Sequence, residues 1–166
     1  MRMRRAWSLL AAMMVVIVAG AASSAETPSI RKITVNLSFE EAELLLTTEA
    51  QRQNLNLVNV LDIRKGMENR GGSFRKYKIY QFCNLELGIR IYSDSPDYGA
   101  FQLCSVLIYE VDSSRTALVS SRQSWVLQAL PGHRPGPEAA AAARQFERII
   151  DEIFEAVTEE GRARGK

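Results

Sequence analysis

Residues 30–53, IRKITVNLSFEEAELLLTTEAQRQ, decide the fold because they place a strand and a helix in direct succession. Apolar and polar side chains alternate over residues 33–37, which is typical of a half-buried strand. Ser38 then precedes Glu41 by three residues, the spacing of a capping box at the start of a helix. Apolar residues follow at helical spacing, and we expect the helix to end near Gln53. A half-buried strand followed by an amphipathic helix predicts a sheet with helices on one face.

The rest of the chain alternates short strands with helices. Strands are predicted at residues 55–63, 77–83, 101–110 and 116–121, short helices at 64–70 and 84–93, and an ambiguous segment at 125–130. The strand at 55–63 is apolar enough on both faces to be interior. Together these elements predict an α+β two-layer sandwich, with a mostly antiparallel sheet of about five strands and helices packed on one face.

The C-terminal part predicts a long amphipathic helix. Residues 131–137 form a connector rich in proline and glycine, which follows a domain at 26–130. The helix is expected at 138–160, with Pro137 at its first position and Gly161 just past its end. Its apolar stripe is worth several kcal/mol when buried, at about 25 cal/mol per Å². We therefore expect the helix to pack on the domain.

Composition restricts the class of protein. The 166 residues are 46% apolar and 24% charged, with two cysteines, so they suit one compact domain. They are too apolar for a disordered tail and too poor in cysteine for a small disulfide-stapled protein. No residue pattern identifies a reaction, and we expect a protein that is not an enzyme.

The first 25 residues predict a signal peptide. Three arginines open the chain, residues 6–22 carry no charge, and Ser23-Ser24-Ala25 supplies the small residues of a cleavage site after Ala25. This pattern predicts export across the inner membrane to the periplasm. The alternative is an uncleaved anchor formed by residues 6–22, because 17 residues lie at the lower limit for spanning about 30 Å of hydrocarbon.

Cleavage changes the charge balance. Removing three arginines from the 21 basic residues leaves 18, against 19 acidic residues, so the small positive net charge of the precursor comes from its first segment. Binding to phosphate backbones needs a clustered positive surface. Although basic and aromatic residues interleave over 70–78, a charged strand edge explains them equally well. We therefore expect no nucleic-acid partner, and membrane contact only through the N-terminal segment if it stays uncleaved.

Cys83 and Cys104 are the two cysteines, and three interpretations remain open. A disulfide would close a loop of about 21 residues and stabilise the fold by roughly 3 kcal/mol. Two separate buried thiols would pack as small apolar groups. A redox or ligand-binding thiol is the third, because Cys83 precedes a predicted helix whose N-terminus would favour a thiolate. Neighbouring Asn84 would add a hydrogen bond.

These segments carry a family resemblance. Tyr80–Asn84, Asp97–Val106 and Tyr109-Glu110 together resemble the domain-of-unknown-function family numbered 302. The family shows Phe-Cys-Asn-Pro before a short helix and Pro-Cys at the start of an apolar strand; Leu85 and Leu103 replace those prolines here. The resemblance covers about residues 33–125. It implies a small two-layer α/β domain, often dimeric, with no settled activity.

Other candidate sites have ordinary explanations. His133, the only histidine, lies in a loop without ligands at metal-binding spacing, so no metal site is expected. Asp94, Asp97 and Glu110 could gather around a cation, but the Asp-Ser-Pro-Asp segment is typical of a turn, so no calcium site is expected. The chain has no Gly-x-Ser-x-Gly elbow, phosphate loop or dinucleotide fingerprint, and no cofactor is expected.

The sequence therefore predicts an exported binding protein, acting as a homodimer on an unknown protein or small molecule. Its candidate site is a corner formed by Cys83, Asn84 and Cys104, with Tyr98 and Phe101 nearby. A first alternative is a thiol-redox or sulfur-carrying protein in which Cys83 reacts and Cys104 resolves. A second alternative is a structural protein of the cell envelope.

Overall fold

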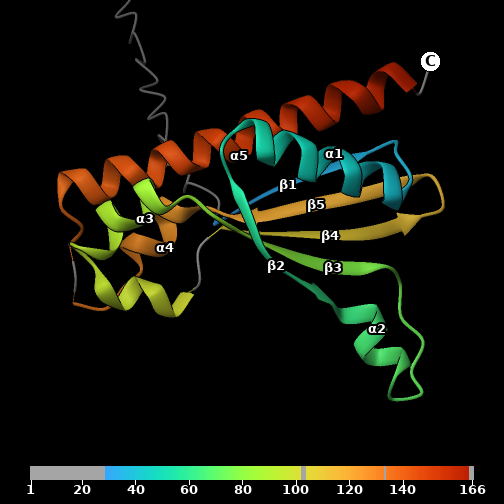
Figure 1. Ribbon diagram of the computed structural model, residues 1–166, viewed down its shortest axis with the longest axis horizontal. Coiled ribbons are helices and arrows are strands. Elements are labelled where there is room, and N and C mark those ends of the chain that lie inside the picture. The colour runs from blue at the N-terminus through green and yellow to red at the C-terminus, as the bar shows by residue number, and fades with distance from the viewer. Residues whose placement is uncertain (1–28, 102–103, 133, 165–166) are drawn as a thin grey trace, which may run out of the picture.

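The protein is a five-stranded antiparallel sheet with helices on one face (Figure 1). The computed structural model describes residues 29–101, 104–132 and 134–164, so the predicted signal peptide and His133 lie outside the described residues. The strands are β1 (Ile30–Val35), β2 (Asn56–Asp62), β3 (Tyr77–Cys83), β4 (Ser105–Asp112) and β5 (Arg115–Ser121). They lie in the order β1-β5-β4-β3-β2, and every neighbouring pair is antiparallel. The predicted fold class is confirmed.

Two helices, α1 (Phe39–Arg52) and α5 (Pro137–Arg164), cover the same face of the sheet (Figure 1). The capping box that begins α1 is present: the Glu41 amide donates to Ser38 Oγ at 3.4 Å, and the Ser38 amide donates to Glu41 Oε2 at 2.9 Å. Val106, Ile108 and Leu118 of the central strands are fully buried beneath the helices. These residues place the core on the helix side, as the sequence pattern predicts.

The shorter helices lie at the two ends of the sheet. They are α2 (Ile63–Glu68), α3 (Leu85–Tyr92), a 3-10 helix (Pro96–Phe101) and α4 (Gln123–Gln128). The helices α3 and α4 pack against α5, whereas α2 projects from the body of the molecule (Figure 1). In the part of the chain that the structure describes, no helix is both long and apolar enough to cross a bilayer.

Two predicted boundaries are wrong. The strand expected from Phe101 begins at Ser105, because Phe101 ends the 3-10 helix and Cys104 has a φ of 54°, which interrupts extended backbone. The final helix does not stop before Gly161 but continues to Arg164. A Cβ on Gly161 would lie 3.3 Å from Val35 Cβ, so this glycine permits close packing on β1 rather than ending the helix.

The prediction that residues 55–63 form an interior strand is also wrong. The strand β2 is the last strand of the sheet, and all seven of its residues are exposed. Val58 and Leu57 keep 68% and 47% of their surface accessible. The sequence pattern shows only that β2 is apolar on both faces, because it cannot show which neighbours the fold supplies. An apolar strand therefore lies at an uncovered edge.

Candidate functional site

The structure places the two cysteines at one end of the sheet, where they do not form a disulfide. Both are free thiols. The Phe82 amide donates to the Cys104 carbonyl at 3.1 Å, so Cys104 lies opposite Phe82, and both side chains belong to the core. Cys83 is the next residue of β3, and its thiol lies near enough to Cys104 to contribute to the raised pKa of that thiol. The disulfide expected among the alternatives is therefore not found.

The Cys104 thiol is poorly suited to redox chemistry. It is only 2% exposed, and burial raises its pKa well above the ordinary range for a thiol. The thiolate is the reactive form of cysteine, so a buried thiol with a raised pKa is a weak nucleophile at neutral pH. Cys83 is half-buried at the end of β3. A resolving role for Cys104 gains no support from this geometry.

The other residues of the predicted corner have structural partners. Asn84 caps α3 by accepting the Leu87 amide at 3.1 Å, and its own amide donates to the Asn54 carbonyl at 3.5 Å. The buried Tyr98 hydroxyl donates to the Gln123 side chain, and burial raises the pKa of Tyr98. Phe101 lies apart from them at the surface, beside a cavity of about 260 Å³. Cys83, Cys104 and Tyr98 thus lie near one another, but Cys104 and Tyr98 are buried, so the corner offers no open site.

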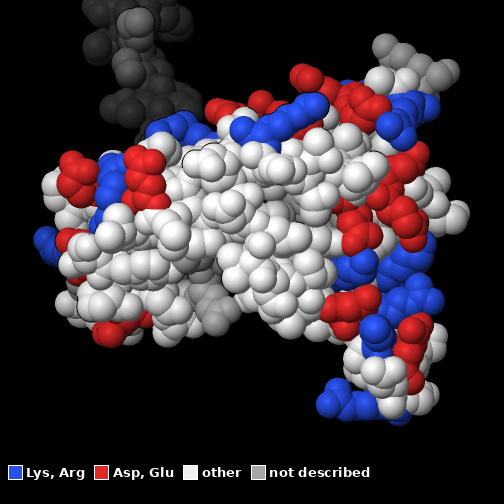
Figure 2. All heavy atoms as spheres, viewed as in Figure 1, with Lys and Arg blue, Asp and Glu red and all other residues white. Residues whose placement is uncertain are grey.

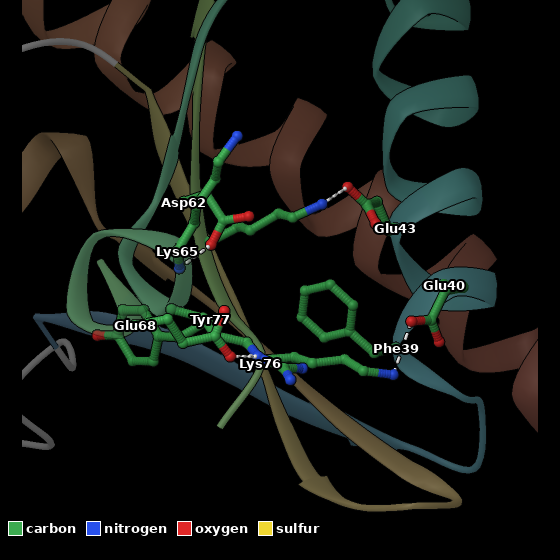
Figure 3. A pocket seen from close by; sticks show the side chains of 10 residues that line it. Phe39, Glu40, Glu43, Asp62, Lys65, Glu68, Lys76 and Tyr77 are labelled. Carbon is green, nitrogen blue, oxygen red and sulfur yellow. Dashed lines mark hydrogen bonds and ion pairs between the residues drawn. The ribbon is translucent and has the colours of Figure 1, made fainter. Parts of the chain in front are cut away.

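A larger concave surface lies between α1 and β2. Two adjoining hollows of about 500 and 530 Å³ share Glu40, Glu43 and Lys78 and form what we call the α1–β2 groove; Figure 3 shows the first of them. Its lining residues are Phe39, Glu40, Glu43, Leu44, Thr47, Leu57, Val60, Asp62, Arg64, Lys65, Glu68, Lys76, Tyr77, Lys78 and Tyr80. Volumes in this range are typical of small-molecule sites. The groove is the best candidate site in the described residues.

One end of the groove carries paired charges. Lys76 Nζ lies 2.6 Å from Glu40 Oε1, and Lys78 Nζ lies 2.6 Å from Glu43 Oε1. The ammonium groups of these lysines also lie 5.8 and 5.6 Å from the centre of the Phe39 ring, which Figure 3 shows between the two ion pairs. The hydrogen bond from Lys76 lowers the pKa of Glu40. These contacts connect α1 to the start of β3.

Beyond these pairs, α2 adds a second set of charges. Arg64 Nε lies 2.6 Å from Glu68 Oε1, whereas Asp62 accepts the Lys65 backbone amide at 2.9 Å. Among the residues that the structure describes, the Lys65 ammonium has no carboxylate within ion-pair distance. The groove lining contains four basic and four acidic residues in this region (Figure 3). It can therefore oppose both signs of charge in one ligand.

The other end of the groove is apolar. Leu44 of α1 is 66% exposed and faces the same hollow as Leu57 and Val60 of β2. The Tyr80 ring lies at the base, and its hydroxyl donates to Glu43, so this tyrosine joins the apolar and charged ends. Burial, and then the Glu43 carboxylate, raise the pKa of Tyr80 well above its ordinary value. The groove is therefore amphiphilic along its length.

Sequence reasoning did not find this groove. Its β2 wall was assigned to the interior, and its charges come from three segments that are separated in the chain. One signal was present: Leu44 lies outside the apolar stripe of α1, whose members Phe39, Ala42, Leu46 and Ala50 are buried. A single exposed apolar residue is common on protein surfaces, and Leu44 indicates a site only together with the exposed Leu57 and Val60 that the fold places beside it.

The remaining sequence candidates do not form a site. Glu110 lies 3.5 Å from Lys76 and so joins the groove ion pairs, while Asp94 accepts the Gly136 amide at 3.1 Å. No group of three or more His, Cys, Asp and Glu residues in the described residues is placed to hold a metal ion. Arg75 lies over the Tyr109 ring at 5.9 Å. The basic stretch is thus divided among separate contacts.

Comparisons with known proteins agree on the fold. A sequence model described as "Domain of unknown function DUF302" matches residues 31–153. A crystal structure of an uncharacterized conserved DUF302 protein from Bacillus stearothermophilus superposes with a TM-score of 0.68 at 13% identity. The match covers 78% of this chain and 98% of the other. No curated protein matches the chain.

Proposed function

The chain belongs to the DUF302 family, and from this premise we propose that it is an exported, non-catalytic protein that binds a small amphiphile. The ligand has an alkyl chain and a zwitterionic head group, and it binds in the α1–β2 groove. The observation that carries this proposal is the division of one groove into an apolar end at Leu44, Leu57 and Val60 and a charge-balanced end.

The groove chemistry favours this class of ligand. An alkyl chain would cover leucine and valine side chains that are exposed in the free protein, at about 25 cal/mol per Å² of apolar surface removed from water. A head with both charges would meet Lys65 on one side and Asp62 on the other without separating the ion pairs of Glu40 and Glu43. A ligand with one charge would leave half of this surface without a complementary partner.

A thiol-based function has weaker support. It requires Cys83 and Cys104 to exchange a disulfide, yet Cys104 lies in the core and its pKa is raised by burial. Exchange would need the end of β4 to open. The thiol alternative predicts that mild oxidation joins the two cysteines rapidly in the folded protein. The binding proposal predicts that both thiols persist.

Export is the second part of the proposal. It rests on the three arginines, the uncharged segment at 6–22 and the Ser-Ser-Ala sequence before residue 26. Intact mass of the protein from a periplasmic fraction tests it directly. A mass that begins at Glu26 supports cleavage, whereas a full-length chain in the membrane fraction supports the anchored alternative and contradicts the periplasmic one.

The binding test uses dodecylphosphocholine below the concentration at which it forms micelles. Isothermal titration should show saturable binding to the chain without its first 25 residues. Leu44→Ser should weaken this binding about fivefold or more, since it removes a buried apolar contact worth about 1 kcal/mol or more. Leu85→Ser is the matched control, because Leu85 is 78% exposed on α3, outside the groove.

Two results would contradict the proposal. One is the absence of saturable binding. The other is an equal loss of affinity in the two serine variants, which would show that the probe adsorbs to exposed leucines in general. Dodecyl sulfate and dodecylammonium, tested in the same way, should bind more weakly than the zwitterion if the charge-balanced end selects the head group.

A further inference from the structure

The strand β2 combines an interior sequence with an edge position. Its apolar residues are exposed on both faces, and its outer edge has no neighbouring strand in the sheet. Figure 2 shows a surface without charged side chains over most of β2, whereas charges gather near α2 and along α5. An exposed apolar edge strand is a template for pairing with another strand. The β2 edge is therefore open to pairing with a strand of another chain.

The sequence of β2 identifies the partner. Residues 56–62 read Asn-Leu-Val-Asn-Val-Leu-Asp, which is the same in both directions about Asn59 except for the amide and acid at its ends. When two copies of a strand pair antiparallel about a two-fold axis, residues equally far from the centre face each other. A two-fold axis at Asn59 would therefore place valine opposite valine on both sides of the axis, with Leu57 on the helix side and Leu61 on the other face because the register shifts beside Val58. This strand is complementary to itself.

We propose that a second copy of this chain pairs with β2, so that two five-stranded sheets join into one antiparallel sheet with its two-fold axis at Asn59. Asn59 of each copy faces its equivalent. The Asn59 amide donates to Gln81 Oε1 at 3.0 Å, and an amide side chain has a further donor and an oxygen acceptor for the equivalent asparagine. Like apolar residues pair on both sides of this centre.

The charges and backbone of β2 are compatible with this pairing. Asp62 is its one charged residue, and it faces Asn56 of the second copy, so no like charges lie opposite each other. Val58 has no register partner on β3, because the pairing shifts between Leu57 and Asn59. In the paired strands Val58 faces Val60 of the second copy. The most exposed residue of the strand thereby gains an apolar neighbour.

Pairing at β2 also changes the α1–β2 groove, a consequence that rests on the proposed function. Leu57 and Val60 are register partners of the core residues Phe82 and Tyr80, so they lie on the helix side of the sheet. Two paired β2 strands would form a common floor, and the α1 helix of each copy would form a wall. Leu44 of both copies would then face one trough from opposite sides. The ligand site is complete only in the dimer.

The first experiment introduces charge at the two-fold axis. Analytical ultracentrifugation over a range of concentrations should show a dimer for the native chain. Asn59→Lys places two like charges opposite each other and should weaken association about tenfold or more, and Asn59→Asp should do the same. An equal mixture of the two variants should dimerise again. Gln128→Lys, an exposed amide on α4, is the control that should not change association.

The second experiment tests the register. Directly opposed residues have Cα atoms about 4.5–5.5 Å apart, within the range that a disulfide tolerates, whereas diagonal neighbours lie about 7–8 Å apart. In a Cys83→Ser background, Asn59→Cys should therefore link to itself on mild oxidation. Val58→Cys or Val60→Cys alone should not, but a mixture of those two should. Buried Cys104 can remain in place.

The results separate this inference from the proposed function. A chain that stays monomeric at every concentration yet binds dodecylphosphocholine overturns the dimer and leaves ligand binding intact. A dimer that the Asn59 variants do not weaken also overturns the β2 pairing. A dimer with the expected register that does not bind the probe supports the pairing and contradicts the ligand proposal. Circular dichroism of each variant confirms that the fold is retained.

Discussion

The two edge strands of the sheet differ in how their surfaces are covered. The outer strand β1 carries Arg31 and Lys32 and contacts α5, and Arg31 lies 3.2 Å from Asp151 of that helix. The opposite edge strand, β2, has four exposed apolar residues and its one charge at the end, Asp62. Charged side chains and covering elements prevent edge strands from pairing. The β1 edge is therefore closed, whereas the β2 edge is open to a partner.

The largest difference should come from the same substitution near each edge. Leu37 follows β1 and is 2% exposed, so Leu37→Ala should lower the free energy of unfolding by about 2–5 kcal/mol. Leu57 on β2 is 47% exposed, and Leu57→Ala should change the free energy of unfolding by no more than about 0.5 kcal/mol. Urea titration at a concentration where the chain is monomeric measures both. Equal effects would show that the two edges are not different.

A pair of glycines gives the next largest effect. Gly161 of α5 packs on the β1 side, where a Cβ would lie 3.3 Å from Val35 Cβ and 3.4 Å from the Asn36 nitrogen. Gly161→Val should therefore destabilise the protein by about 1–3 kcal/mol through overpacking. Gly66 in α2, beyond β2, has no atom within 4 Å of a Cβ position.

Gly66→Ala should instead stabilise the protein by about 0.5–1 kcal/mol, because alanine favours helical backbone. Thermal unfolding of the two variants measures the difference in sign. A stabilising Gly161→Val would mean that α5 does not pack closely on β1. A destabilising Gly66→Ala would mean that α2 has neighbours beyond those described here.

The local elements were more predictable than their positions. The capping residues Ser38 and Glu41 specify the start of α1 through neighbouring backbone amides, so a short stretch of sequence is sufficient. The place of β2 in the sheet depends on long-range pairing with β3, and periodicity alone does not distinguish an interior strand from an edge strand covered by another chain. A prediction of the candidate groove would require both the start of α1 and the place of β2 in the sheet. Burial of the predicted cysteine corner was not predictable either, because the packing of Cys104 and Tyr98 in the core depends on long-range contacts.

The N-terminal cap of α1 gives a smaller effect on the β1 side. Ser38→Ala removes the acceptor for the Glu41 amide and should lower the free energy of unfolding by about 1 kcal/mol. Asp62 caps α2 beside β2 by accepting the Lys65 amide, and Asp62→Ala is the matched change. Since α2 has no buried residue, Asp62→Ala should destabilise the protein less than Ser38→Ala, and hydrogen exchange should show local fraying of α2.

The smallest expected effect is a pH dependence at the same cap. The hydrogen bonds from Ser38, followed by Arg164, lower the pKa of Glu41 below 4.5. A carboxyl group whose pKa is lower in the folded state stabilises fully above its unfolded pKa, and this stabilisation is lost as the pH falls through the folded value. Because Glu41 connects the start of α1 to the end of α5 through Arg164, 2.7 Å away, its protonation should loosen both.

Denaturant midpoints measured from pH 6 downward should fall less steeply below about pH 4.5 in Glu41→Gln than in the native chain. Parallel curves would show that this contact at the closed edge does not contribute to acid stability.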